Sequence, residues 1–576
     1  VSTDPAYSML ADTSGNYPGG ISSTQAGYAR NLYALLTGRV STLAGNFYQN
    51  ADGSEYVYLG DRVQSFSVND LALFVSDAWR LKPSLSLTAG VRWELQFPVV
   101  PQNSAYARLQ DWAQVYGVTG QGNLFKPGTM NGSAPMLVQY AKGDKPYNTD
   151  LNNFAPSVGV VWRPNLGKGF LAKVLSSDPV IRGGYSISYE REGFALFTGM
   201  FGSNPGASRS GARSISLGNL GTDGLGLPVL LSQTSRLGPP TTPEVSFPFA
   251  PAVNESLNVY DPNFYVPYTH QYSLGWQREL GRNMALEVRY IGNRSLSGSD
   301  FQWNLNASSN WNIIENGFYD EFRKAQANLQ ANIAAGKGNT FAYTGVAGTS
   351  PLPIFQAYFA GIPLSDARNQ SASSYTSSNY SNSSWYNQLA LYNPNLTGMS
   401  GTGTSGLQNS ARAANAAAAG LPANFFQINP SVYTGGAWLK TNGGATTYNA
   451  VQIELRRRMT NGLLVQGSYN YGHRTTYSWP TLRDETWHSV PSTAGPDHAI
   501  KFNWVYELPF GHGKKFGSGV SKWVNYIIGG WEFDGVARFQ SGNKFNFGGS
   551  QGYALVGMTA RDVQDMFKFY RRTDAN

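Results

Sequence analysis

The sequence predicts an all-β protein, a large antiparallel β-barrel that spans a membrane. Two observations carry this prediction. Apolar and polar residues alternate over segments of about ten residues, and short connections between these segments take turns with long ones. A period of two indicates a strand with one apolar and one polar face, and a strand that crosses a bilayer needs roughly 9 to 11 residues. Outer-membrane barrels have short turns on one side and long loops on the other.

The clearest pattern lies in the hairpin Phe66–Phe97. From Ser84 to Phe97 every second residue is apolar, and a short connection at 81–83 separates this run from an earlier alternating run. Strands of soluble domains typically have about five or six residues, so these strands are long enough to cross a bilayer. We therefore predict that their apolar face contacts lipid, while the face that carries Arg92 and Glu94 turns towards a watery interior.

Composition agrees with a barrel. Charged residues make up 14% of the 576 residues, and aromatic residues also make up 14%, whereas a charged share of about 25% is usual. Mean hydropathy is −0.32, and no apolar run reaches the roughly 18 residues of a transmembrane helix. Cysteine is absent, which excludes disulfides and thiolate metal sites. The net charge of +8 is scattered along the chain, so we expect anionic lipid as a partner rather than nucleic acid.

Four more hairpins repeat the pattern. Their arms are 154–163 with 180–191, 272–280 with 284–290, 451–459 with 463–471, and 502–506 with 531–539. The turn Thr460-Asn461-Gly462 in the fourth contains Asn-Gly, which is the strongest short hairpin signal. Short connections lie at 81–83, 164–179, 281–283, 460–462 and 510–528, and long ones at 98–153, 192–267, 304–445 and 477–496. We predict ten strands in this portion, or up to twelve.

Weaker patterns give further predictions. Residues 31–42 are a candidate strand, 56–64 extends the first hairpin beyond the membrane, and the arm that begins at Met284 continues to Trp303. Within the loop 304–445, apolar residues at helical spacing predict a helix over about 319–335, which Gly336 ends. Residues 559–570 predict a second surface helix behind a capping pair.

Several segments resemble a known family. Phe74–Trp79 with Leu85–Glu94, and Tyr272–Glu279 with Glu287–Gly292, resemble the barrel of TonB-dependent outer-membrane receptors. Tyr448–Gln452, Tyr506–Gly511 and Gly529–Trp531 with Gln540–Gly542 resemble the Oar-like branch of acidobacteria and myxobacteria. The resemblance covers about residues 30 to 570.

The resemblance implies a barrel of about 22 strands around an N-terminal plug, a periplasmic segment that contacts TonB, and often a carboxypeptidase-regulatory-like domain. This sequence contains no recognisable plug, TonB-contacting segment or signal peptide. Ten to twelve strands would leave a large barrel open, with two unpaired edges. We therefore expect an internal portion of a longer chain, truncated at both ends. The expected partners are outer-membrane lipid and lipopolysaccharide, and the TonB complex through a segment absent here. A surface lipoprotein over the mouth of the barrel is a further partner that stays open.

Charged residues on the polar columns are candidates for a lumen-facing surface. They are Arg92, Glu94, Arg182, Glu190, Glu287, Arg289, Glu454, Arg456, Glu532, Asp534 and Arg538. Two interpretations are open: they line a permeation path, or they form cross-strand pairs that stiffen the wall. Tyrosines of the loop 304–445 are candidates for ligand capture, because aromatic rings stack on sugars and pack on peptides. They are Tyr375, Tyr380, Tyr386 and Tyr392.

No constellation for catalysis is present. The five histidines do not pair at ligand spacing, and nucleophile-elbow, zincin and P-loop motifs are absent. His488 and His498, with Asp484, Glu485 and Asp497, form the one candidate cation site, for which solvated loop residues are the simpler interpretation. We expect no enzyme activity, metal or cofactor.

The function hypothesis from sequence is a TonB-dependent active transporter in the bacterial outer membrane that takes up an oligosaccharide, a peptide or a chelate. Two alternatives stay open. One is a structural or adhesive surface protein, and the other is a barrel for protein export.

Overall fold

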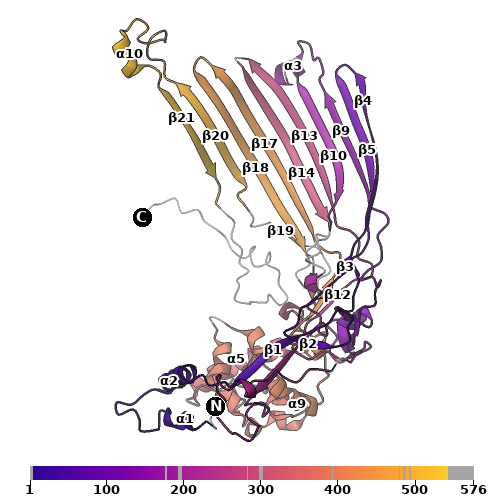
Figure 1. Ribbon diagram of the computed structural model, residues 1–576, viewed down its shortest axis with the longest axis vertical. Coiled ribbons are helices and arrows are strands. Elements are labelled where there is room, and N and C mark those ends of the chain that lie inside the picture. The colour runs from indigo at the N-terminus through magenta and orange to yellow at the C-terminus, as the bar shows by residue number, and fades with distance from the viewer. Residues whose placement is uncertain are drawn as a thin grey trace.

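One large antiparallel sheet dominates the fold (Figure 1). The computed structural model describes residues 4–542 except 176–177, 192–197, 201, 245, 282, 297–301, 392–393, 479–480, 484–487 and 492–494. Ten strands pair in chain order: β4 (Asp70–Lys82), β5 (Leu85–Gln96), β9 (Phe154–Trp162), β10 (Val180–Tyr189), β13 (Tyr268–Gly281), β14 (Met284–Leu296), β17 (Ala445–Thr460), β18 (Leu463–Ser478), β20 (His498–Glu507) and β21 (Glu532–Gln540). These are the ten predicted strands, and β19 (His488–Pro491) adds a short pairing to β18. Within the described residues the sheet is open, with β4 and β21 as its edges. Closure with about 22 strands stays a prediction.

The short connections follow from local turn chemistry. Asn461 and Gly462 both have positive φ, at 53° and 74°, as a two-residue hairpin turn with the twist of its strands requires. At the β13–β14 hairpin, Gly281 at the end of β13 and Asn283 in the turn likewise have positive φ. Two connections of the short set, at 164–179 and 510–528, are longer than the others. They contain the helices α3 (Phe170–Leu175) and α10 (Lys522–Ile528). Figure 1 places both helices at the same end of the sheet.

Strand register separates the side chains into two faces. Opposite residues of an antiparallel pair share a face, so Leu73, Trp93 and Phe154 lie together. Large apolar side chains on this face, the apolar face, are more than a third exposed: Leu71, Leu73, Val75, Trp79, Val91, Phe154, Val158, Trp162, Tyr185, Leu274, Tyr290, Ile453, Leu455, Tyr471, Ile500, Phe533 and Phe539. No described helix or second sheet covers them. The opposite face, the polar face, carries Ser, Thr, Gly, Asn and charged residues, with Phe74, Val161 and Val536 as exposed apolar exceptions.

Aromatic rings cluster on the apolar face. Trp93 stacks on Phe154 with ring centroids 5.7 Å apart, and Tyr189 lies 5.6 Å from Tyr268. Trp504 lies 5.8 Å from Phe533, next to the connection that carries α10. Aromatic residues near both ends of a membrane-spanning strand suit the two headgroup layers.

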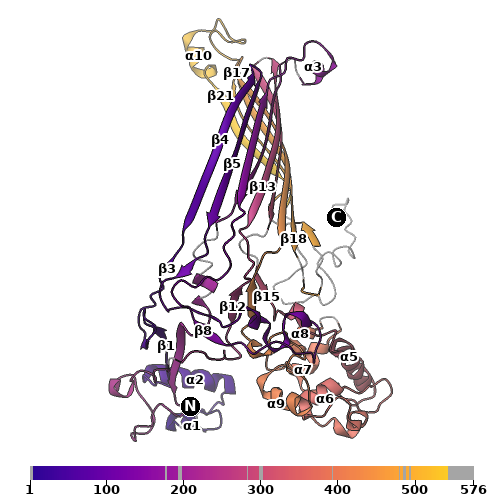
Figure 2. The same ribbon diagram turned by 90° about the vertical axis from the view of Figure 1, so that its right-hand side faces the viewer.

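The long connections and the described residues before β4 form a second body, here called the loop body, at the end of the sheet away from α3 and α10 (Figures 1 and 2). Its sheets are β11–β1–β2, β12–β16–β15, β3–β6 and β7–β8. The strands are β1 (Thr42–Gln49), β2 (Tyr56–Tyr58), β3 (Phe66–Ser67), β6 (Val100–Pro101), β7 (Ala107–Leu109), β8 (Leu137–Gln139), β11 (Ser208–Ser214), β12 (Leu257–Tyr260), β15 (Gln302–Asn304) and β16 (Ala437–Lys440). Only β12 and β16 pair in parallel among the strands described.

The helices of the loop body are α1 (Pro5–Met9), α2 (Ser23–Leu36), α5 (Phe318–Ala334), α6 (Pro353–Ala360), α7 (Ser383–Tyr386), α8 (Leu396–Ser400) and α9 (Ser410–Ala418). Short 3-10 helices are η1 (Trp112–Thr119), η2 (Gln121–Asn123), η3 (Thr234–Arg236), η4 (Ser308–Asn310), η5 (Ala367–Gln370), η6 (Ala372–Ser374), η7 (Ser378–Ser381), η8 (Asn387–Leu389) and η9 (Pro430–Val432). None of the described helices combines the length and the apolar content that crossing a membrane requires.

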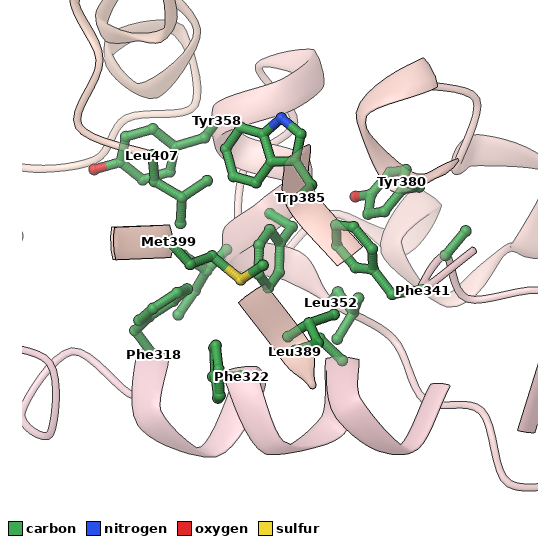
Figure 3. Close-up of a cluster of buried hydrophobic side chains, with 14 of the residues drawn as sticks. Phe318, Phe322, Phe341, Leu352, Tyr358, Tyr380, Trp385, Leu389, Met399 and Leu407 are labelled. Carbon is green, nitrogen blue, oxygen red and sulfur yellow. The ribbon is translucent and has the colours of Figure 1, made fainter. Parts of the chain in front are cut away.

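Three hydrophobic cores fill the loop body. The largest, here called the aromatic cluster, belongs to the loop 304–445 (Figure 3). In it Phe318 and Phe322 of α5 face Trp385 and Met399. A second core joins residues of all three longest loops, including Leu109, Leu257 and Ile428. The third joins the loops 98–153 and 192–267. The long loops therefore fold on one another rather than extend as separate arms.

Three sequence predictions about this body are wrong. Residues 31–42 are not a strand: α2 continues to Leu36 from a capping box between Ser22 and Gln25, and alternation begins only with β1. Residues 56–64 do not extend the first hairpin, because Tyr56–Tyr58 pairs with β1. The arm from Met284 ends at Leu296, and Gln302–Asn304 pairs with β16 in another sheet. The predicted helix at 319–335 is confirmed as α5, whereas 559–570 lies outside the described residues.

Candidate functional site

The predicted lumen-facing residues lie on one face of the sheet. Strand register puts ten of them on the polar face: Arg92, Glu94, Arg182, Glu287, Arg289, Glu454, Arg456, Glu532, Asp534 and Arg538. Glu190 follows β10 directly, and its backbone N–H donates to the carbonyl of Pro267. Successive residues of a strand point to opposite faces. An alternation read one residue out of step would therefore have placed residues of this set on the apolar face.

Four of these residues form a charged cluster in the middle of the sheet, here called the polar-face quartet. Glu287 and Arg289 of β14 lie beside Glu454 and Arg456 of β17. The nitrogen–oxygen distances are 3.5 Å for Arg289–Glu287, 3.7 Å for Arg289–Glu454, 3.5 Å for Arg456–Glu287 and 3.3 Å for Arg456–Glu454. Each charge therefore meets two of opposite sign, which supports the interpretation that cross-strand pairs stiffen the wall.

Elsewhere the polar face also carries ion pairs. Arg92 lies 2.6 Å from Glu94 on the same strand, and Arg191 lies 2.6 Å from Asp70. The arginines are about half exposed, at 49% and 57% of their side-chain surface, so each pair contributes only roughly 0 to 1 kcal/mol. That these residues line a permeation path stays a prediction.

Small side chains hollow one part of the polar face. A depression of about 420 Å³ crosses β5 to β14, and Ser157, Gly184, Ser186 and Ser273 are among its lining residues. A glycine or serine brings the backbone close to whatever occupies the space in front of the sheet. The depression lies beside the quartet, because Ile291 and Asn293 of β14 also line it.

The tyrosines predicted for ligand capture do not form an exposed surface. Tyr375 and Tyr380 are 8% and 1% exposed, and both belong to the aromatic cluster. Tyr375 Oη accepts a bond from the N–H of Leu352 and donates to the carbonyl of Asn369, and burial raises the pKa of Tyr375 to about 12. The prediction is wrong for these two, because packing rather than solvent exposure places their rings. Tyr386 is half-buried against the same cluster, and Tyr392 lies outside the described residues.

Buried asparagines join the long loops, and sequence analysis did not single them out. Asn204 donates to the carbonyls of Ala107 and Asn258, which links the loops 98–153 and 192–267. Asn429 donates to the carbonyls of Gln114 and Val115, which links 304–445 to 98–153. Asparagine side chains are common in polar surface loops, so composition alone gave no signal that these are buried.

The described part of the loop 477–496 is joined to the same body by Leu482, whose N–H donates to Asn310 Oδ1 at 2.9 Å, and by Arg483. Arg483 Nε lies 2.6 Å from Glu315 Oε1, and Arg483 NH2 lies 3.0 Å from Glu315 Oε2. Its guanidinium also donates to the carbonyl of Ser309 at 2.6 Å. This two-point contact between a guanidinium and a carboxylate fixes orientation as well as distance.

The described residues contain no group of three or more His, Asp or Glu side chains that would hold a metal ion. Of the predicted cation site, Asp484 and Glu485 lie outside the described residues. His498 Nδ1 lies 2.9 Å from Tyr469 Oη across β18 and β20, so one of its ring nitrogens has a tyrosine partner.

Comparison with known proteins gives one clear match. Over residues 6–572 the sequence matches the family described as an outer membrane beta barrel domain. No curated protein matches the sequence.

Several solved structures resemble the fold at low identity. The ferripyoverdine receptor of Pseudomonas aeruginosa has 8% identity and a TM-score of 0.27, with 79% of this chain and 28% of that chain covered. The alcaligin receptor FauA of Bordetella pertussis has 8% identity and a TM-score of 0.25, with 78% and 36% covered. The FrpB iron transporter of Neisseria meningitidis has 8% identity and a TM-score of 0.25, with 81% and 46% covered. The chain thus spans less than half the length of each of these proteins.

Proposed function

Because this chain belongs to the outer membrane beta barrel domain family, we propose that it forms part of an outer-membrane transporter that takes up a ligand from outside the cell. The protein is located in the bacterial outer membrane. In finer detail, we propose the TonB-dependent type and its Oar-like branch, on the segments that resemble them.

The observation that carries this proposal is the division of the sheet into two faces. The large apolar side chains of the apolar face lie exposed together on one side of the sheet, and a water-soluble protein rarely exposes an apolar patch larger than a few hundred Å². Contact with lipid stabilises such a face, while the polar face then borders a hydrated interior. A route for a polar ligand along Arg92, the polar-face quartet and Arg538 follows from that arrangement.

The loop body gives the ligand a place to bind first. The described residues of the three longest loops gather at one end of the sheet and pack into one folded unit (Figure 2), and in outer-membrane barrels the long loops are extracellular. We propose that the loop body captures the ligand and the polar face borders its path. In this proposal a plug closes the lumen, and the TonB complex opens the path with energy from the inner membrane.

A second candidate function is surface adhesion. A loop body with three hydrophobic cores is large and ordered enough to bind another cell or a matrix without any transport. The two functions differ in their need for energy, because adhesion requires no proton gradient.

The test is depletion of a casein digest from the medium, followed by mass spectrometry, in cells with and without the full-length protein. Transport predicts that a subset of peptides disappears only when the protein is present, and that removal of TonB or collapse of the proton gradient abolishes the loss. Peptides that bind to the cells equally well after the gradient is collapsed would favour adhesion and contradict transport.

A further inference from the structure

Arg294 is a charged residue on the apolar face, near the end of β14 that leads to the loop body. The residues before it on the same face of this strand are apolar: Met284, Leu286, Val288 and Tyr290. Arg294 follows Met284 by ten residues. At about 3.3 Å per residue and a strand tilt of roughly 40°, ten residues rise about 25 Å, which is the height of the apolar band of an outer-membrane barrel. The side chain therefore lies at the level of the lipid headgroups.

The charge of Arg294 has no counter-charge on this face. Its side chain is exposed, and it makes no ion pair or hydrogen bond with any residue that the structure describes. In the three cross-strand rows around it, the positions of this face on β10, β13, β17 and β18 hold Tyr, Ile, His, Ala, Thr and Asn, and none holds Asp or Glu. An anion from the surroundings would stabilise this guanidinium, because basic side chains at headgroup depth attract anionic lipid.

Asn449 of β17 offers only hydrogen-bond donors beside Arg294. It lies opposite Gly292 and is thus a diagonal neighbour of Arg294. Its Oδ1 accepts bonds from Tyr272 Oη at 3.2 Å and from Tyr290 Oη at 2.7 Å, whereas its Nδ2 has no partner among the described residues. Diagonal neighbours are about 7 to 8 Å apart, a span that a long side chain such as arginine covers.

Gly292 makes this arrangement possible. Tyr272 lies on β13 and Asn449 on β17, so the ring of Tyr272 has to cross β14 to reach the amide. A Cβ at position 292 would overlap that ring. The absence of a side chain at Gly292 therefore lets two tyrosines occupy the acceptor of Asn449 and leave its N–H groups open.

His270 of β13 adds a third group opposite Arg294. Its Nδ1 lies 2.9 Å from Tyr185 Oη. When the tyrosine hydroxyl donates to Nδ1, the other ring nitrogen, Nε2, carries the proton and is a donor. Three neighbouring strands thus bring donors to one place on the apolar face.

From the unpaired guanidinium, the open donors and their depth, we propose that Arg294, Asn449 and His270 bind the phosphate group of an outer-leaflet lipid. Phosphate oxygens carry negative charge and only accept hydrogen bonds, which matches a site made of donors. The apolar residues Tyr290 and Val288 continue from the site towards the middle of the bilayer, where they would contact the acyl chains of that lipid. Free phosphate lacks this second contact. The proposal goes beyond ligand uptake, and its tests do not depend on transport.

The first test compares two lipids that differ only in the phosphate, dioleoylphosphatidic acid and dioleoylglycerol. Native mass spectrometry measures how much of each lipid binds to the full-length protein in a maltoside detergent, which contains no phosphate. We expect phosphatidic acid to bind about tenfold more tightly, since charge-assisted hydrogen bonds separate the two lipids. Equal binding by the unmodified protein would overturn the proposal, and this comparison does not depend on how a variant folds. Displacement of the lipid by excess inorganic phosphate would assign the donors to a soluble anion and would also overturn it.

The second test compares Arg294 with an arginine at a similar depth on the other face. Arg474 of β18 is exposed and lies opposite Tyr448, which in turn lies opposite Asn293, so it belongs to the polar face one row from Arg294. Arg294→Gln should weaken the binding of phosphatidic acid about fivefold. Arg474→Gln removes the same charge and should leave binding unchanged. Equal losses in the two variants, or no loss in Arg294→Gln, would contradict the site.

A third variant changes the donor without changing the shape. Asn449→Asp keeps an oxygen for the hydroxyls of Tyr272 and Tyr290, but it replaces the open N–H groups with a negatively charged oxygen. We expect phosphatidic acid to bind at least as weakly as in Arg294→Gln, while dioleoylglycerol binds as it does to the unmodified protein. Normal binding of phosphatidic acid by Asn449→Asp would overturn the proposal.

Discussion

Two hydrogen bonds join Asn306 to Asn429, which are 123 positions apart in the chain. Asn306 Nδ2 donates to the carbonyl of Asn429 at 2.8 Å, and the N–H of Asn429 donates to Asn306 Oδ1 at 2.9 Å. The side chain of Asn429 then donates to the carbonyls of Gln114 and Val115 at 3.3 and 2.9 Å. One asparagine thereby joins both ends of the longest loop to the loop 98–153.

Removing this side chain should loosen the loop body and spare the sheet. Asn429→Ala removes its hydrogen bonds to the carbonyls of Gln114 and Val115, each worth about 0.5 to 1.5 kcal/mol, so we expect the stability of the loop body to fall by about 1 to 3 kcal/mol. Hydrogen exchange followed by mass spectrometry should show faster exchange in η1 and unchanged exchange in β13 and β14. The control is Asn339→Ala, at an exposed position. Unchanged exchange in η1 would show that the hydrogen bonds of Asn429 do not stabilise the contact between the two loops.

A buried carboxyl group makes the loop body sensitive to pH. Glu321 of α5 is 4% exposed, and its two oxygens accept bonds from the N–H groups of Ile354 and Phe355 at 3.0 and 2.8 Å, at the start of α6. Burial raises the pKa of Glu321 to about 8, although these two hydrogen bonds act in the opposite direction. The folded loop body therefore keeps a proton on Glu321 at a pH where the unfolded chain, with a pKa of about 4.5, has lost it.

The sign of the pH effect follows from proton binding. Between pH 4.5 and pH 8 the folded state binds more protons than the unfolded state, so stability falls as pH rises through this range. Hydrogen exchange of α5 and α6, corrected for the intrinsic rate, should become faster relative to the sheet from pH 5 to pH 8. Glu321→Gln should remove this trend, and Asp320→Asn, at the exposed neighbouring position, should keep it. A Glu321→Gln variant with the same trend would show that another group titrates.

The large sheet could be predicted from the sequence much better than the loop body could. The ten strands were predictable because the alternation that signals a membrane-crossing strand is local, and Asn461-Gly462 marks its own turn. In the loop body helix α5 was predictable from its local spacing, but the assembly was not, because its bonds are distant in sequence, as between Asn306 and Asn429, and the chain gives no local sign of them. Tyr375 and Tyr380 show the same limit: an aromatic residue in a polar tract suits either a binding surface or a core, and only packing decides.

The polar-face quartet should contribute little to stability and should respond to salt. Arg289 and Arg456 keep 44% and 51% of their side-chain surface exposed, so water screens their attraction to the glutamates. A double-mutant cycle of Glu287→Gln with Arg456→Gln should give a coupling below about 1 kcal/mol that shrinks at high salt. The control cycle pairs Arg456→Gln with Asp534→Asn, whose strands are separated by β18 and β20, and should show no coupling. A coupling of several kcal/mol that salt does not change would mean that the quartet is closed to water.

Two neighbouring residues of β13 test which face of the sheet contacts lipid. Leu274 lies on the apolar face opposite Tyr290, and Ser273 lies on the polar face opposite Ile291, and both are exposed. Arginine in place of Leu274 would bring a charge into the hydrocarbon layer, at a cost of about 2 to 4 kcal/mol near the midplane. Arginine in place of Ser273 would extend into the hydrated interior beside Gly184 and cost far less.

The comparison of Leu274→Arg with Ser273→Arg is internally controlled, because both add the same side chain to the same strand one residue apart. Denaturant unfolding from phospholipid vesicles measures the two free energies, and resistance of the folded form to SDS gives an independent measure. We expect Leu274→Arg to be the less stable variant by about 2 kcal/mol or more. Equal losses would mean that both faces meet the same solvent. A larger loss at Ser273 would place lipid against the polar face, and the route for a polar ligand along Arg92 and the quartet would then have no hydrated space to run through.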